Sequence, residues 1–179
     1  MWLLMLAGAP AYPQPLGQSS QPFFRAAART GPFSPSGPCP PSSGRSIRMA
    51  KGMGIAAPQI GIGRAAALVQ LPEPDTPAIV LLNPRITDSS RDEDEQYEGC
   101  LSFFDVRGRV PRPLRITVET TTLDGEVATT TYHRGLARLI HHEVDHLDGL
   151  LYTARMRTGI DPIPVEEYRQ TGHSWAYKQ

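Results

Sequence analysis

The sequence predicts an α+β fold in which antiparallel strands pack around one central helix. Short apolar or alternating segments come first, between residues 65 and 132, with a hairpin signal at Asp124-Gly125. One stretch with helical apolar spacing follows and stops before Gly149, which is a typical residue just after a helix. Strands followed by a helix are typical of α+β proteins rather than of a wound parallel sheet.

The strands are predicted in chain order from their periodicity. Residues 65–71 and 79–82 are apolar runs of strand length, separated by a proline-rich turn. Residues 88–98 are acidic and polar and are expected to form a solvated loop. Residues 115–132 are rich in Thr and Val with period-two alternation, which predicts two strands of a hairpin.

Composition excludes several classes of function. The chain has 179 residues, and its 18 basic and 18 acidic side chains cancel, so nothing indicates binding to nucleic acid or to an anionic membrane. No apolar run approaches the length of a membrane span. The two cysteines, Cys39 and Cys100, show no disulfide framework, which favours a reducing, cytoplasmic compartment where a thiol is free to bind metal.

The N-terminal part of the chain differs from the rest. Residues 1–48 contain no Asp or Glu and are rich in Pro, Ser and Arg, so we expect them to be disordered or loosely packed. Arg and Ser without acids would also fit an organellar targeting segment, which is the weaker alternative. Residues 49–179 are expected to form the folded, catalytic domain.

The predicted helix carries the sequence His142-Glu143-Val144-Asp145-His146, which reads His-Glu-x-x-His. Two imidazoles four residues apart on a helix lie on one face and can share a metal ion. Glu143 would then lie beside that metal, where it can move the protons of a water molecule. An amphipathic helix with ordinary surface histidines is the alternative.

Cys100, in Glu98-Gly99-Cys100-Leu101-Ser102, supplies a third candidate ligand. Two imidazoles and one thiolate leave a coordination position open for water, which is the catalytic rather than the structural pattern. The alternative is a small buried apolar residue, which is common for a free cysteine.

A glycine-rich segment, residues 52–59, precedes the first predicted strand. It lacks the Lys-Ser/Thr ending of a phosphate-binding loop and has no strand before it, so we discount that function. Its last residue, Gln59, offers an amide donor that can polarise a carbonyl.

These three segments, in this order, resemble the motifs of the peptide deformylase family. Gly-x-Gly-x-Ala-Ala-x-Gln is matched by residues 52–59, with Ile55 where Leu is usual, Glu-Gly-Cys-x-Ser by 98–102, and the histidine motif by 142–146. The resemblance covers about residues 49–179 and implies the deformylase-like fold, with the motif helix at the centre of antiparallel strands.

The resemblance implies a hydrolase that removes the N-formyl group from the formylmethionine of new peptides and releases formate. Cys100, His142 and His146 would bind Fe²⁺, with Zn²⁺ or Ni²⁺ as alternatives. Glu143 would transfer protons, while the Gln59 amide and the Leu101 backbone N–H would stabilise the oxyanion. The expected partners are N-formylmethionyl peptides and the ribosome near the nascent-chain exit.

The resemblance also implies a set of residues near the substrate. Gly54 would pair its backbone with the extended peptide, and Arg107 would lie at the pocket mouth. The methionine pocket would be lined by Met53, Glu98, Leu139 and His142.

Two features depart from the family pattern. Phe103-Phe104 follow Ser102 where an apolar residue and Pro are frequent, which would reshape the pocket wall. Residues 1–48 replace the family's first helix, of which only residues 47–51 keep a trace, through a divergent N-terminus or a changed reading frame. A catalytically impaired homologue is therefore one alternative, and a His-Glu-x-x-His peptidase that uses the downstream His173 is another.

Overall fold

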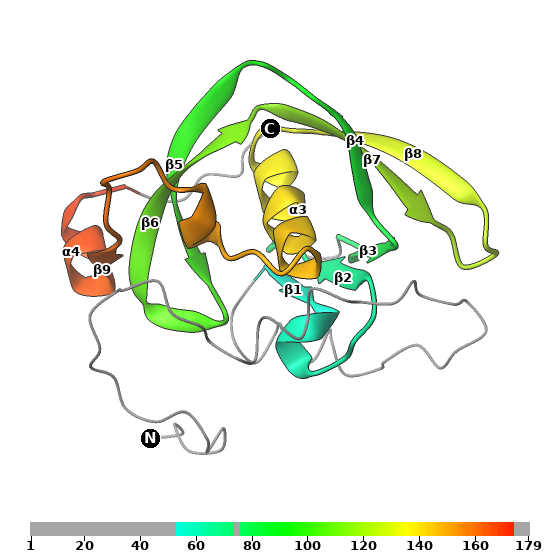
Figure 1. Ribbon diagram of the computed structural model, residues 1–179, viewed down its shortest axis with the longest axis horizontal. Helices are drawn as coiled ribbons and strands as arrows, with labels where there is room; N and C mark the ends of the chain where they lie inside the picture. The colour runs from blue at the N-terminus through cyan, green and yellow to red at the C-terminus, as the bar shows by residue number, and fades with distance from the viewer. Residues whose placement is uncertain (1–52, 74–75, 174–179) are drawn as a thin grey trace.

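The computed structural model describes residues 53–73 and 76–173, and the predictions made for the N-terminal segment, Cys39 and the helix trace at 47–51 lie outside these ranges. Three three-stranded antiparallel sheets surround a central helix, α3 (Figure 1). Their strand orders are β1-β2-β3, β4-β7-β8 and β5-β6-β9. The predicted α+β class is confirmed. The strands are β1 Gly54–Ala56, β2 Ala66–Val69, β3 Ile79–Leu82, β4 Arg85–Ser89, β5 Glu93–Cys100, β6 Phe103–Pro113, β7 Arg115–Thr121, β8 Val127–His133 and β9 Ile163–Pro164.

The helix α3 (Arg134–Leu147) is the element around which the sheets are arranged. Its apolar residues recur at helical spacing and pack against the inner faces of the first two sheets, so that one core joins them. Gly149, with φ of +75°, ends the helix as the sequence predicted. Three shorter helical segments complete the described chain: η2 Ala57–Ile60, η3 Tyr152–Arg155 and α4 Val165–Gln170.

The predicted strands at 65–71 and 79–82 and the predicted hairpin are confirmed. β2 and β3 fall within the first two ranges. β7 and β8 pair from Arg115↔His133 to Thr121↔Val127, with Gly125 at φ of +87° in the turn. A left-handed residue at this position is the reason that Asp-Gly predicts a hairpin.

The prediction that residues 88–98 form a solvated loop is wrong. Most of this range belongs to β5, which pairs with β6 along Glu93↔Pro113 to Glu98↔Gly108, and its start lies in β4. The acidic side chains do not require solvent, because arginines contributed by distant segments pair with several of them. The glycine-rich segment was expected to precede the first strand. Its residues 54–56 instead form a strand themselves, β1, which pairs with β2.

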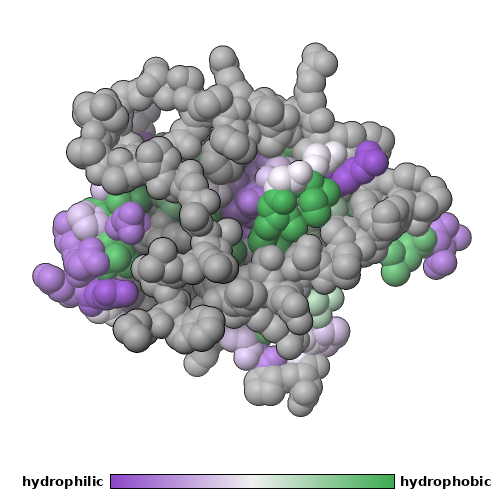
Figure 2. Space-filling view, turned by 90° about the horizontal axis from the view of Figure 1, so that it is seen from below, coloured by the Kyte–Doolittle hydropathy of each residue, from purple (hydrophilic) through white to green (hydrophobic). Residues whose placement is uncertain are grey.

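Large exposed hydrophobic side chains are few among the described residues: Val80, Leu123, Val127 and Ile160. In the view of Figure 2, hydrophobic residues form a patch near the middle of the face, beside hydrophilic ones. No helix within residues 53–73 and 76–173 combines the length and the hydropathy needed to cross a membrane.

Candidate metal centre and active site

His142 and His146 lie one turn apart on the buried face of α3. Their Nε2 atoms are 3.2 Å apart, and both side chains are almost fully buried. The spacing of four residues produces this geometry, because it brings side chains nearly above one another on a helix. The two imidazoles therefore point their ring nitrogens at one common location.

Cys100 reaches the same location from the end of β5. Its Sγ lies 3.1 Å from His146 Nε2, and one ligand atom from each of the three residues lies within 4.8 Å of the others. A register shift between Glu98 and Cys100 marks a bulge at the end of the strand, a feature that often re-aims a side chain.

This cluster fits a transition metal. Bonds of about 2.0–2.3 Å to sulfur and nitrogen in tetrahedral geometry place ligand atoms roughly 3–4 Å apart, which matches the observed separations. The donor set of one thiolate and two imidazoles suits Fe²⁺, Zn²⁺ and Ni²⁺. With three protein ligands in the cluster, one position remains for water or substrate.

The electrostatics favour a thiolate at Cys100. Burial opposes ionisation of the thiol, but the contacts with His142 and His146 outweigh it and lower the pKa of Cys100 to about 5. A thiolate is the form that binds metal, so the protein presents this ligand in its binding state at neutral pH.

Glu143 lies beside the cluster in a pocket that Gly54 makes possible. A Cβ at residue 54 would stand 2.1 Å from Glu143 Oε1, so only glycine leaves room for this carboxylate. The side chain is 3 % exposed, and its Oε2 has no hydrogen-bond partner among the described residues. Burial raises the pKa of Glu143 to about 7, although His142 and His146 oppose the shift. Such a carboxyl can both accept and deliver a proton near neutral pH.

Gln59 lies beside Cys100 and is held by three contacts. Its Oε1 accepts a hydrogen bond from the Ala56 backbone N–H at 2.8 Å. Its Nε2 donates to Ser102 Oγ at 3.1 Å and lies 3.5 Å from Cys100 Sγ. The Ala56 contact orients the amide, so that its donor end points toward the metal ligands.

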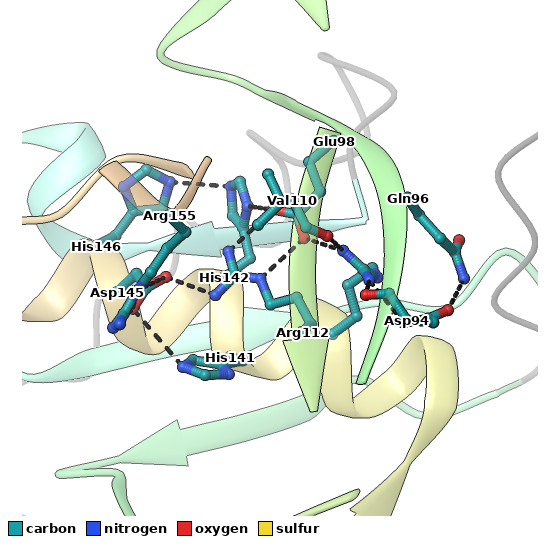
Figure 3. A network of polar contacts seen from close by, with 11 residues as sticks. Asp94, Gln96, Glu98, Val110, Arg112, His141, His142, Asp145, His146 and Arg155 are labelled. Carbon is teal, nitrogen blue, oxygen red and sulfur yellow. Dashed lines mark hydrogen bonds and ion pairs between the residues drawn. The ribbon is translucent and has the colours of Figure 1, made fainter. Parts of the chain in front are cut away.

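Glu98 contacts the ring nitrogen of His142 that does not face the ligand cluster. Its Oε2 lies 3.0 Å from His142 Nδ1, while Arg112 donates to both carboxylate oxygens at 2.9 Å (Figure 3). A carboxylate on the distal nitrogen fixes the tautomer in which Nε2 is free to bind metal. Burial opposes ionisation of Glu98, but the contacts with Arg112 and His142 hold its pKa well below the usual range.

Asp145 ties this arrangement to a second arginine. It accepts hydrogen bonds from Arg112 at 2.6 Å and from Arg155 at 2.7 Å, so this side chain orients arginines rather than a metal ligand. Its neighbour His141 is not a member of the ligand cluster.

The other predicted residues are distributed around the site. Leu101 directly follows Cys100 in the turn between β5 and β6. Met53 and Leu139 belong to the main core or pack against it. The Arg107 guanidinium lies over Gly99, where a Cβ would be 2.7 Å away, and Nη1 donates to the Val106 carbonyl.

Sequence reasoning missed several residues at the site. Arg112 and Arg138, each 1 % exposed, contact Glu98, and Ser102 donates its backbone N–H to Cys100 Sγ at 3.3 Å. Tyr152 stacks on His142 with ring centroids 6.1 Å apart. One signal was available: Arg138 lies four residues before His142 and therefore on the same helix face as the two histidines of the motif.

A buried thiolate and two imidazoles around one location, with a buried carboxyl and an oriented amide beside them, define a metal-dependent hydrolase. The Polypeptide deformylase family model matches residues 45–159 of the chain. The chain therefore belongs to the polypeptide deformylase family, whose members are hydrolases, and the fold predicted from the resemblance is confirmed.

Individual relatives agree with this assignment. A peptide deformylase of Roseiflexus castenholzii is 40% identical over 126 residues, which cover 63% of this chain and 68% of the relative. One of Natranaerobius thermophilus is 40% identical over 106 residues, covering 59% and 67%. A Met-Ala-Ser-bound class I type b peptide deformylase of Acinetobacter baumannii superposes with a TM-score of 0.66 at 32% identity, covering 73% of this chain and 92% of that one.

Proposed function

We propose that this chain removes the formyl group from the N-terminal formylmethionine of new peptides, with the cluster around Cys100 as its catalytic centre. The observation that carries this proposal is the buried Glu143 carboxyl, which has a free oxygen next to three converging metal ligands. The Met-Ala-Ser peptide in the A. baumannii structure supports a methionine terminus as the product.

Cys100, His142 and His146 would hold the metal, for which we propose Fe²⁺, with Zn²⁺ or Ni²⁺ as alternatives. When bound, such a metal acts as a Lewis acid that acidifies water and polarises a carbonyl oxygen. Two neutral imidazoles and one thiolate would bind the metal. Burial opposes protonation of His142, but the contacts with Cys100 and Glu98 raise its pKa to about 10, so metal binding would displace a proton from this imidazole, and Glu98 would keep it in the required tautomer.

Glu143 would carry the protons of the reaction. Hydrolysis of the formamide consumes one water, breaks the C–N bond and yields formate and a free amine. Glu143 takes a proton as water adds to the formyl carbon and gives it to the leaving nitrogen. A carboxyl whose pKa lies near 7 suits both steps.

Gln59 and Leu101 would stabilise the negative charge that develops on the formyl oxygen. The Gln59 amide is already oriented by Ala56 and points its donor toward the ligand cluster. The Leu101 N–H follows the ligand Cys100 directly. Donors that are fixed before the reaction need no reorganisation when charge develops.

For the substrate, we propose contacts with Gly54, Met53, Leu139 and Arg107. For Glu98 we propose a different role from the pocket contact expected. Its two oxygens already accept from Arg112, Arg138 and His142, so the carboxylate serves to position His142.

The peptidase alternative has no support. His173 lies beside Tyr97, with ring centroids 5.9 Å apart, and is not a member of the ligand cluster. For the location we propose the cytoplasm, with substrates met near the ribosomal exit, and co-sedimentation with translating ribosomes would test this.

The decisive experiment measures formate release from formyl-Met-Ala-Ser by the full chain purified anaerobically, with metal analysis of the same sample. Wild type should contain about one metal ion per chain and release formate, whereas Glu143→Ala should keep the metal and lose the activity. Wild type that is no more active than Glu143→Ala would show a catalytically impaired homologue and overturn the proposal.

A further inference from the structure

Arg138 is a buried arginine for which the proposed reaction has no use. It lies on α3 one turn before His142 and makes four hydrogen bonds. Nη1 donates to Glu98 Oε1 at 2.7 Å and to the Val110 carbonyl at 2.8 Å. Nη2 donates to Asp94, at 2.9 Å to its carbonyl and at 2.7 Å to its carboxylate.

These contacts join the elements that carry the metal ligands. Two of the candidate ligands come from α3, and the third, Cys100, ends β5. Arg138 projects from that helix and binds Asp94 and Glu98 of that strand, the latter only two residues before Cys100. The arginine therefore links the helix that carries two candidate ligands to the strand that carries the third.

Arg112 completes the arrangement from β6. It binds Glu98 and also Asp145, which lies on α3 immediately before His146. Glu98 is thus held between two guanidinium groups, and one of its oxygens faces His142 Nδ1. Arg112 links Glu98 to α3 through Asp145, whereas Arg138 connects the helix directly to β5 at both Asp94 and Glu98.

Arg138 is poorly suited to a role in stability alone. Its Nε is buried without a hydrogen-bond partner among the described residues, which costs free energy. Buried ion pairs are often no more stabilising than apolar residues of similar volume, because both charges must be desolvated. A side chain that binds two strands through four directed contacts is, in contrast, well suited to fixing their position.

We propose that Arg138 is a positioning residue that holds α3 against β5 and thereby sets the separation of Cys100 from His142 and His146, and with it the affinity for the metal. This inference rests on the proposed metal-dependent function. Supporting groups of this kind typically change metal affinity by about 10- to 100-fold when they are removed.

The test compares Arg138→Met and Arg138→Lys with wild type in the full chain. Methionine keeps the apolar stem without donors, and lysine keeps the charge but cannot reach several acceptors at once. Affinity for Co²⁺ is measured by competition with a chelator, the visible spectrum of the Co²⁺ form reports the ligand geometry, and melting curves are recorded with and without metal.

Two control variants separate positioning from stability. Arg115→Met removes the ion pair between Arg115 and Asp88 on the β4-β7-β8 sheet. The Arg115 side chain is 37 % exposed, so this variant loses an arginine outside the buried network. Ile140→Val weakens the core from the same helix without touching the network. Both controls should bind Co²⁺ as wild type does, even where melting falls.

Arg138→Met should lose about 10- to 100-fold in Co²⁺ affinity and show an altered spectrum, with Arg138→Lys between it and wild type. Wild-type affinity in Arg138→Met, with only a lower melting temperature, would overturn the inference. Failure of the proposed deformylase function is distinguishable from failure of the Arg138 inference, because in the former case wild type would bind metal and release no formate. Wild type that binds no Co²⁺ at all would overturn both.

Discussion

The carboxylate of Glu143 lies directly against the α-carbon of Gly54, so that β1 and α3 approach one another only because residue 54 has no side chain. A methyl group would overlap Oε1 and would have to displace it, since β1 is paired with β2 and cannot move freely.

Gly54→Ala is therefore expected to reduce formate release by about 10²- to 10⁴-fold, the range for loss of a positioned proton-transfer group. Metal content should stay near one ion per chain, because the atoms nearest to a Cβ at residue 54 all belong to Glu143 and not to a proposed ligand. Gly63→Ala is the matched control, since a Cβ there meets nothing within 4 Å. Equal activity of the two variants would contradict the proposed place of Glu143 in the reaction.

Gln59→Leu removes the amide donor that points toward the ligand cluster. We expect kcat to fall by about 10²- to 10³-fold with little change in metal content, as for loss of one oxyanion donor. Gln70→Leu provides the comparison, because the Gln70 amide donates to the Leu71 and Thr76 carbonyls. If Gln59→Leu raised KM alone, the amide would bind the substrate without stabilising the transition state.

The stability of the metal-free protein should fall in acid. Despite burial, the contacts with Arg112 and His142 depress the pKa of Glu98 in the folded state. A depressed pKa contributes stability that is present above the ordinary value of 4.5 and lost as pH falls below it. Urea unfolding between pH 7 and pH 3 should show a loss of up to about 2 kcal/mol from this group.

Glu98→Gln should be less stable than wild type at pH 7 and should show a shallower loss of stability in acid. Asp88→Asn is the control: the pKa of Asp88 is also lowered, by Arg115, but this carboxylate is exposed and its variant should follow the wild-type curve. A Glu98→Gln curve parallel to that of wild type would show that other carboxylates govern acid unfolding.

Removal of the metal should lower the melting temperature, because a ligand that binds only the folded state stabilises it. Dialysis against a chelator, followed by addition of Zn²⁺, should lower and then restore the transition. Cys100→Ser should respond weakly, since serine offers no thiolate. A chelator-insensitive melting temperature in wild type would contradict a metal centre at these residues.

The catalytic helix could be predicted from local sequence because His142, Glu143 and His146 lie within five residues and share one face. Gln59 and Cys100 could also be predicted as neighbours of the motif helix, since each belongs to a short ordered motif, and the structure places Gln59 Nε2 and Cys100 Sγ 3.5 Å apart. The hairpin around Gly125 was predictable for the same reason: one glycine with positive φ determines the turn.

The network behind the site was not predictable in this way. Residues 88–98 look like a solvated loop because acidic residues in sequence carry no sign of what will pair with them. Their partners Arg112 and Arg138 come from β6 and α3, 14 and 40 residues after Glu98. The charged end of β5 can be buried because β5 pairs with β6 and because Arg112 and Arg138 then lie against Glu98.

The separation of 46 residues between Cys100 and His146 has a consequence for folding. Three strands must be made and paired between the two ligands, so the site depends on contacts distant along the chain, which form slowly. A peptide carrying only the helix motif would lack its thiolate, and a growing chain would lack the complete site until α3 has been synthesised. The centre is thus assembled late, as a product of the nearly finished fold.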